Sequence, residues 1–420
     1  MEIIKNKQIN ETFYIEVLEN GLKICIVPKE TKKKYIIWGT NFGSNNNKFY
    51  AKNETTLSTV PDGIAHYLEH KLFEQKNGKN SLDVLTSLGA DANAYTTNDH
   101  TAFLFETTKN FEKALDEFMD YVQNPYFTPE NVEKERGIIS QEIMMYDDYP
   151  DWKLYMNLMN SLYKKNEMNI DTAGSVESIK AIDEKLLYKI YDNFYTPENM
   201  VICYVGNDDP NEILSKIKSR VIMKKSNSFA RKYYNEEPKE LVRNHVEDNK
   251  NLSVPLICIG FKDNNYSKDI VKRDVAIDII GNSIFGPCSD FYKRLYESGK
   301  ITSDPYISHE FGASYGHVMI QTQTRYVDDF SVEIKKELEK YKSKKISDRD
   351  FERALKCEYG ILVKSYNDPQ SLGNMILTEN IKNIKPFEYF DVFKTIDLDY
   401  VQQILTEIFD EKYMAISIMK

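Results

Sequence analysis

Short apolar segments, separated by glycine, proline and polar turns, open the chain. Residues 21–28 and 35–42 are rich in β-branched and aromatic side chains and are bounded by Gly or Pro, which is typical of strands. Residues 92–96 and 101–107 have the same character and flank a polar turn. The first hundred residues therefore predict a β-sheet.

The period of the apolar positions changes after residue 60. Ile64, Leu68 and Leu72 recur at every fourth position, behind Asp62, which can cap a first helical turn. This spacing predicts a helix over residues 60–73.

Two further helical patterns cover residues 111–123 and 129–145, the second behind a Thr-Pro pair that is typical of a helix start. The second half of the chain repeats this plan weakly, because residues 330–341 and 347–353 resemble the two helices in sequence. We therefore expect an α+β protein of two similar halves, each a mostly antiparallel sheet covered by helices.

A polar, strongly charged stretch begins at Met223 and separates the two halves. Such a composition is typical of a linker between domains. We expect one half at 1–222, a linker at 223–250 and a structurally similar half at 251–420.

Composition argues against several classes of protein. The formal net charge of −10 argues against a nucleic acid or an anionic membrane as the main partner, and no apolar run approaches the roughly 18 residues of a transmembrane helix. The five cysteines form no Cys-x-x-Cys unit, which argues against a thiolate zinc site or a disulfide framework. The N-terminus lacks the apolar region of a secretory signal, so we expect a cytoplasmic protein.

The chain has only six histidines, and two of them are clustered. His66 and His70 lie four apart in the predicted helix, so their imidazoles share one face, with Glu69 beside them. Two histidines at this spacing can bind one zinc ion, and a carboxylate from elsewhere would complete a catalytic ligand set. The alternative is a pair of partly buried histidines that hydrogen-bond to their neighbours.

The helix predicted at 129–145 offers two candidates for the third ligand. Glu135 and Glu142 are seven residues apart and therefore share a face, so either could close the site. Asp147 and Asp148 follow beyond the expected helix end. The alternative for Glu135 is an ordinary surface charge.

Three segments resemble the pitrilysin/insulysin family of zinc peptidases, in the branch that contains the mitochondrial processing peptidase. They are His66-Tyr-Leu-Glu-His-Lys-Leu-Phe73, Gly89-Ala-Asp-Ala-Asn-Ala-Tyr-Thr96 and Glu135-Arg-Gly-Ile-Ile-Ser-Gln-Glu142. The first contains the inverzincin motif His-x-x-Glu-His. The resemblance extends over nearly the whole chain, and the chain is similar to the zinc-bearing subunit of paired, processing-protease-like bacterial proteins.

The resemblance implies a role for each residue of the cluster. His66, His70 and Glu142 would bind zinc, Glu69 would act as the general base, and Glu135 would orient a ligand histidine from behind. Bound zinc would polarise a peptide carbonyl and lower the pKa of water. The implied activity is that of a zinc-dependent endopeptidase.

An extended substrate could pair with the strand predicted near the zinc helix. If residues 91–96 form an exposed sheet edge, a peptide can add to it main chain to main chain. We expect Asn93 and Ala94 to contact such a peptide, although the local sequence fits a strand-end or turn role for Asn93 equally well. This mode of binding favours short or unfolded peptides, precursor peptides among them.

The second half lacks the metal set, so we expect a zinc-bearing catalytic half at 1–222 and a non-catalytic half at 251–420. Ile361 occupies the position equivalent to Glu142, and residues 286–294 stand where the zinc helix is expected. The resemblance also implies an Arg and a Tyr, seven residues apart, that hold the substrate, but Tyr296 and Ser303 occupy those positions. We therefore expect a heterodimer in which a homologous partner supplies the Arg/Tyr pair and completes a chamber, or alternatively a homodimer.

A non-catalytic scaffold or a peptide-binding subunit of a related complex is the competing hypothesis for function. The intact combination of two histidines, a third ligand candidate and Glu69 favours the enzyme, because a scaffold needs no general base beside a metal site.

Overall fold

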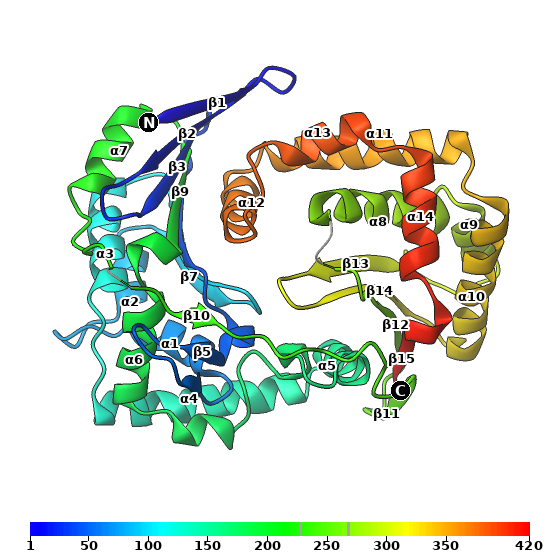
Figure 1. The fold of residues 1–420 in the computed structure, drawn as a ribbon, viewed down its shortest axis with the longest axis horizontal. Coiled ribbons are helices and arrows are strands. Elements are labelled where there is room, and N and C mark those ends of the chain that lie inside the picture. The colour runs from blue at the N-terminus through cyan, green and yellow to red at the C-terminus, as the bar shows by residue number, and fades with distance from the viewer. Residues whose placement is uncertain (227, 267–268) are drawn as a thin grey trace. The chain divides into compact units, whose positions relative to one another are not determined.

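The computed structural model describes residues 1–226, 228–266 and 269–420. The predicted linker at 223–250 includes residue 227, which lies outside the described residues. The chain forms two compact units (Figure 1). The first unit comprises Met1–Met144, Asp171–Tyr234 and Val363–Pro386, and the second comprises Met145–Ile170, Asn235–Leu362 and Phe387–Lys420.

A seven-stranded sheet forms the centre of the first unit, in the order β1-β2-β3-β9-β4-β8-β7. Its strands are β1 (Glu2–Asn6), β2 (Glu11–Val17), β3 (Lys23–Pro28), β4 (Lys34–Thr40), β7 (Asp91–Thr96), β8 (Thr101–Thr107) and β9 (Met200–Gly206). All neighbours pair antiparallel except β3 and β9. A small sheet, β10-β5-β6, joins β5 (Lys48–Tyr50), β6 (Leu57–Thr59) and β10 (Arg231–Lys232).

Helices cover both faces of the large sheet, which explains why β4 and β9 are almost entirely buried. The helices of the first unit are α1 (Ile64–Leu72), α2 (Ser81–Ser87), α3 (Phe111–Gln123), α4 (Pro129–Asp147, in this unit as far as Met144), α6 (Glu184–Phe194), α7 (Pro210–Lys218) and α12 (Pro369–Ile381). Ile36 and Trp38 of β4 belong to the large core that includes α1 and α3. Helix α12 packs on the opposite face of β4 and β9 (Figure 1).

The second unit repeats the plan around a five-stranded sheet, in the order β11-β15-β12-β14-β13. Its strands are β11 (His245–Asp248), β12 (Leu256–Lys262), β13 (Tyr306–Phe311), β14 (Gly316–Gln323) and β15 (Met414–Met419). Its helices are α5 (Pro150–Leu162), α8 (Ile270–Ile284), α9 (Asp290–Glu297), α10 (Val327–Lys344), α11 (Asp348–Ser365, in this unit as far as Leu362), α13 (Glu388–Thr395) and α14 (Leu398–Ile408). The predicted α+β architecture of two similar halves is confirmed.

The order of elements corrects one expected equivalence. The series α8, α9, β13, β14, α10, α11 corresponds to α1, α2, β7, β8, α3, α4, so α8 is the counterpart of α1. Residues 286–294 instead cover the α8–α9 connection and the start of α9. Matching the two halves by one fixed difference in residue number misplaces this helix, because α8 has 15 residues where α1 has nine.

Each unit contains a helix from the other half of the sequence: α12 belongs to the first unit and α5 to the second. Two glycines allow these helices to approach their sheets. A Cβ on Gly39 of β4 would lie 2.6 Å from Leu377 of α12, and a Cβ on Gly260 of β12 would lie 2.8 Å from Leu158 of α5. Each unit is therefore built from several separate segments of the chain, and no single linker divides the two.

Gly39→Ala should lower the free energy of unfolding by about 1–3 kcal/mol, because the added methyl group overpacks the contact with Leu377. Gly360→Ala in α11 is the control, since a Cβ there meets nothing within 4 Å and alanine is the better helix former. Denaturant unfolding of both variants measures the difference. Equal stability of the two variants would contradict close packing at Gly39.

Within the described part of the chain, no helix combines the length and the apolar character that crossing a membrane requires.

Candidate metal centre

Helix α1 carries both motif histidines. It begins at Ile64, behind Gly63, whose φ of 87° lies in the left-handed region. A Cβ added at Gly63 would lie 2.2 Å from the Ala173 carbonyl oxygen, so a glycine fits this position best. Asp62 was expected to cap the helix, but no side chain caps it. The Asp62 carboxylate instead accepts a hydrogen bond of 2.8 Å from Asn47, because the helix starts one residue too late for it.

Helix α4 brings the glutamates to the histidines. Its start fits the predicted signal, since the Thr128 hydroxyl accepts a hydrogen bond of 3.2 Å from the Asn131 amide. The buried Tyr67 of α1 donates its hydroxyl proton to the Val132 carbonyl of α4 and so fixes one helix against the other.

The structure brings His66, His70 and Glu142 together. His66 Nε2 lies 3.7 Å from Glu142 Oε1, and His70 Nε2 lies 3.4 Å from Glu142 Oε2. One possible ligand atom from each of the three residues falls within 4.8 Å of the others. Among the described residues, no other group of three or more His, Cys, Asp or Glu side chains meets this criterion.

The donor set fits zinc. Tetrahedral zinc with bonds of roughly 2.0–2.2 Å separates neighbouring ligand atoms by roughly 3.3–3.6 Å, close to both nitrogen–oxygen distances in this cluster. Burial, with a smaller contribution from His70, lowers the pKa of His66 to about 3, so its imidazole is neutral. A neutral imidazole is the form that binds a metal.

The geometry separates the two glutamates that share a face of α4. Glu142 faces Nε2 of both histidines, whereas Glu135 Oε1 lies 3.1 Å from His70 Nδ1, on the other side of that ring. Burial alone would lower the pKa of His70, but the hydrogen bond to Glu135 and the neighbouring carboxylates outweigh it and raise the pKa. This geometry puts Glu142 where it could share a metal ion with both histidines, and Glu135 where it can orient His70 by a hydrogen bond.

Asp147 and Asp148, the other two acidic candidates, pair with lysines. Asp147 lies 3.5 Å from Lys153, and Asp148 lies 3.3 Å from Lys250.

Glu69 is almost completely buried beside the histidines. Its side chain accepts a hydrogen bond of 2.6 Å from the hydroxyl of Thr96, the last residue of β7. Burial raises the pKa of Glu69 to about 7, although the Thr96 hydrogen bond opposes the shift. A carboxyl group of this kind can both accept and return a proton near neutral pH.

A hollow of about 350 Å³ opens beside Glu69 and His70. Asn93 and Ala94 of β7 line it, and so do the apolar side chains Phe73, Leu82 and Ile138. Strand β7 is the last strand of its sheet. An edge strand therefore borders the hollow at Asn93 and Ala94. The Asn93 side chain accepts a hydrogen bond of 2.9 Å from the Ala94 amide.

Two residues of the site were not identified from the sequence. Thr96 holds Glu69, but it reads as an ordinary strand residue. Lys71 is completely buried, and its ammonium group lies 2.7 Å from Glu74 Oε2 and 4.0 Å from Glu135 Oε2. The spacing of Lys71 and Glu74 predicts an ion pair, but it gives no sign that the lysine is buried.

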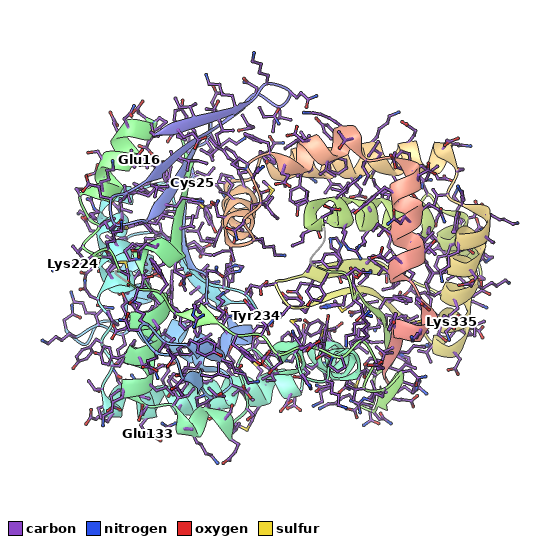
Figure 2. The ribbon with its side chains drawn as sticks, viewed as in Figure 1. Glu16, Cys25, Glu133, Lys224, Tyr234 and Lys335 are labelled. Atoms are coloured by element: carbon purple, nitrogen blue, oxygen red, sulfur yellow. The ribbon has the colours of Figure 1, made fainter. Side chains whose placement is uncertain are left out.

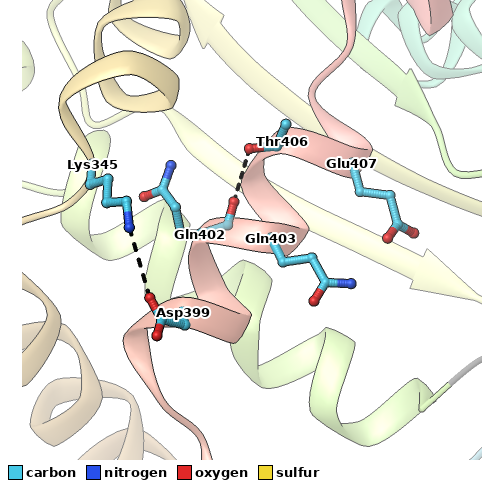
Figure 3. Close-up of a pocket in the computed structure, with 6 residues that line it drawn as sticks. All are labelled: Lys345, Asp399, Gln402, Gln403, Thr406 and Glu407. Atoms are coloured by element: carbon cyan, nitrogen blue, oxygen red, sulfur yellow. Dashed lines mark hydrogen bonds and ion pairs between the residues drawn. The ribbon is translucent and has the colours of Figure 1, made fainter.

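The second unit shows no comparable cluster among its described residues. Ile361 is exposed on α11, and Tyr296 is exposed on α9. A hollow in this unit (Figure 3) is lined by polar and charged side chains, with Lys345 and Asp399 3.9 Å apart. Its lining contains no histidine and no cysteine, so we place the candidate site in the first unit.

Two family models match consecutive parts of the chain. Residues 59–175 match the insulinase (peptidase family M16) model, and residues 181–356 match the model described as the peptidase M16 inactive domain. A Bacillus subtilis protein named as the uncharacterized zinc protease YmfH is 37% identical over 413 residues, which cover 96% of this chain and 95% of the relative.

Solved structures share the fold. A protein from Alicyclobacillus acidocaldarius described as M16-like has a TM-score of 0.94 at 29% identity and covers 99% of both chains. A Helicobacter pylori protease has a TM-score of 0.84 at 19% identity and covers 97% of this chain and 99% of its own. The chain belongs to the insulinase family, peptidase family M16.

Proposed function

We propose that the chain is a zinc-dependent endopeptidase that hydrolyses short or unfolded peptides, precursor peptides among them. The observation that carries this proposal is the convergence of His66, His70 and Glu142 beside the buried Glu69, at a hollow bordered by an edge strand. The names of the relatives support both the metal and the activity.

His66, His70 and Glu142 would hold the zinc ion, which as a Lewis acid polarises the scissile carbonyl and lowers the pKa of water. Glu135 would accept a hydrogen bond from Nδ1–H of His70, so that Nε2 of this ring is free to bind the metal.

Glu69 would move the protons of the reaction. Its carboxylate takes a proton from the attacking water and returns it to the leaving amine. Thr96 holds the carboxylate in place by a hydrogen bond. The outer edge of β7 at Asn93 and Ala94 would pair with the peptide backbone, which restricts the substrate to extended chains.

Removal of zinc should abolish peptide hydrolysis. Treatment with a chelator should eliminate cleavage of a quenched, unstructured peptide, and one equivalent of zinc should restore it, because the ligands in the first unit form a single site. Peptide binding should be measured in parallel. Binding without cleavage in the zinc-loaded state would favour the alternative of a peptide-binding or scaffold subunit.

We further propose that a homologous partner chain completes the substrate chamber. Tyr296 and Ser303 occupy the positions at which the family resemblance implies an Arg and a Tyr, so this chain lacks that pair. Loss of one donor to the oxyanion costs roughly 10²–10³ in kcat. A partner with the Arg/Tyr pair should therefore raise the activity strongly when it is mixed with this chain. Full activity of the chain alone would refute the heterodimer, and a dimer of the chain alone would favour the homodimer.

A further inference from the structure

Strand β7 is held from both faces of its sheet at two consecutive residues. Side chains of neighbouring strand residues point to opposite faces. The Thr96 hydroxyl donates a hydrogen bond of 2.6 Å to Glu69 of α1, and the Tyr95 hydroxyl donates one of 2.6 Å to Asn374 Oδ1 of α12. The strand that borders the candidate site is thus fixed to α1 on one face and to α12 on the other.

Asn374 joins the edge of the sheet to its centre. Its Oδ1 accepts from Tyr95 of β7, while its Nδ2 donates a hydrogen bond of 2.8 Å to the Tyr35 hydroxyl of β4. Strand β8 lies between β4 and β7, so the side-chain amide of Asn374 bridges two strands that are not neighbours in the sheet. Burial raises the pKa of both tyrosines, so both hydroxyl groups stay protonated and keep these hydrogen bonds near neutral pH.

Close packing brings Asn374 within reach of the sheet. The preceding residue is Gly373, where a Cβ would lie 2.5 Å from the Tyr35 ring. Only a residue without a side chain allows this part of α12 to approach β4 so closely. The contact is therefore set by the local packing of α12 on the sheet.

We propose that Asn374 is a positioning residue for peptide hydrolysis, acting through Tyr95 on β7. An edge strand pairs with the sheet on one side only, so its outer residues depend on side-chain contacts for a fixed position. A fixed β7 keeps the Thr96 hydroxyl on Glu69 and presents the backbone of Asn93 and Ala94 to the peptide. This inference rests on the proposed peptidase function, and it assigns a role in that function to the second half of the sequence.

The test compares two asparagines of α12. Asn374→Leu removes the bonds to Tyr95 and Tyr35, whereas Asn380→Leu removes bonds to Lys23 and Cys25 of β3, away from β7. Asn374→Leu should speed hydrogen exchange of the β7 backbone amides roughly fivefold and lower kcat/KM roughly tenfold. Zinc affinity should stay unchanged, because the ligands lie on α1 and α4. Asn380→Leu should leave β7 exchange and kcat/KM unaltered.

Asn374→Asp provides the rescue, because its carboxylate still accepts from Tyr95. It should restore β7 exchange and kcat/KM to within about twofold of the wild-type values. Tyr95→Phe should reproduce the defect of Asn374→Leu, and the double variant should add little to either change. Equal effects of Asn374→Leu and Asn380→Leu, or unchanged β7 exchange in Asn374→Leu, would overturn the proposal. Hydrogen exchange needs no turnover, so absent peptidase activity in the wild type would refute the proposed function separately.

Discussion

Glu69→Gln should leave one zinc per chain and lower kcat for peptide hydrolysis by roughly 10²–10⁴-fold. Glutamine has nearly the same shape and can still accept the Thr96 hydrogen bond, but it cannot take a proton from water. Glu69 lies outside the group formed by His66, His70 and Glu142, so metal binding should persist. Metal analysis and single-turnover cleavage of a quenched peptide measure the two effects on the same sample.

Glu133→Gln is the matched control for this substitution. Glu133 lies on α4, the helix that carries Glu135 and Glu142 (Figure 2). Its side chain is 70% exposed and pairs with Arg136. An exposed ion pair of this kind contributes little to stability, so both zinc content and kcat should be retained. Substantial cleavage by Glu69→Gln, with zinc bound and Glu133→Gln fully active, would exclude Glu69 as the general base.

The second large effect is expected at Glu142. Glu142→Ala removes the carboxylate that faces Nε2 of both histidines, so zinc affinity should fall by more than the 10- to 100-fold typical of an outer-shell change. Activity at limiting zinc should fall in parallel. Competition with a chromophoric chelator gives the affinity, and circular dichroism verifies that the fold is intact.

Glu135→Gln distinguishes the two glutamates of α4. Glutamine can keep a hydrogen bond to His70 Nδ1 but loses the charge, so zinc affinity should fall by roughly 10- to 100-fold, less than in Glu142→Ala. A larger loss of zinc affinity in Glu135→Gln than in Glu142→Ala would show that Glu135 is the ligand and Glu142 the supporting residue.

The sequence could predict the metal site to the extent that local geometry determines it. His66 and His70 share a face because of helical spacing alone, and α1 does form around them. Helical spacing could not choose between Glu135 and Glu142, because residues seven apart share a face as well. Only the packing of α4 against α1 shows that the two glutamates reach opposite sides of the His70 ring.

Long-range packing accounts for most of what the sequence did not reveal. The duplicated plan of strands and helices could be read from periodicity, but α12 packs on β4 and β9, which precede it by more than 150 residues. No local pattern shows that Gly39 faces Leu377, or that Asn374 contacts Tyr95. The burial of Lys71 could not be predicted either, because a lysine three residues before a glutamate is typical of an exposed ion pair.

X-ray absorption at the zinc edge, on the chain loaded with one equivalent of zinc, tests the central claim most directly. The predicted first shell contains nitrogen and oxygen at roughly 2.0–2.2 Å with two imidazoles, and it changes in Glu142→Ala. This measurement needs neither a substrate nor a partner chain. A sulfur shell at roughly 2.3 Å, or a spectrum unchanged by Glu142→Ala, would contradict zinc binding by His66, His70 and Glu142.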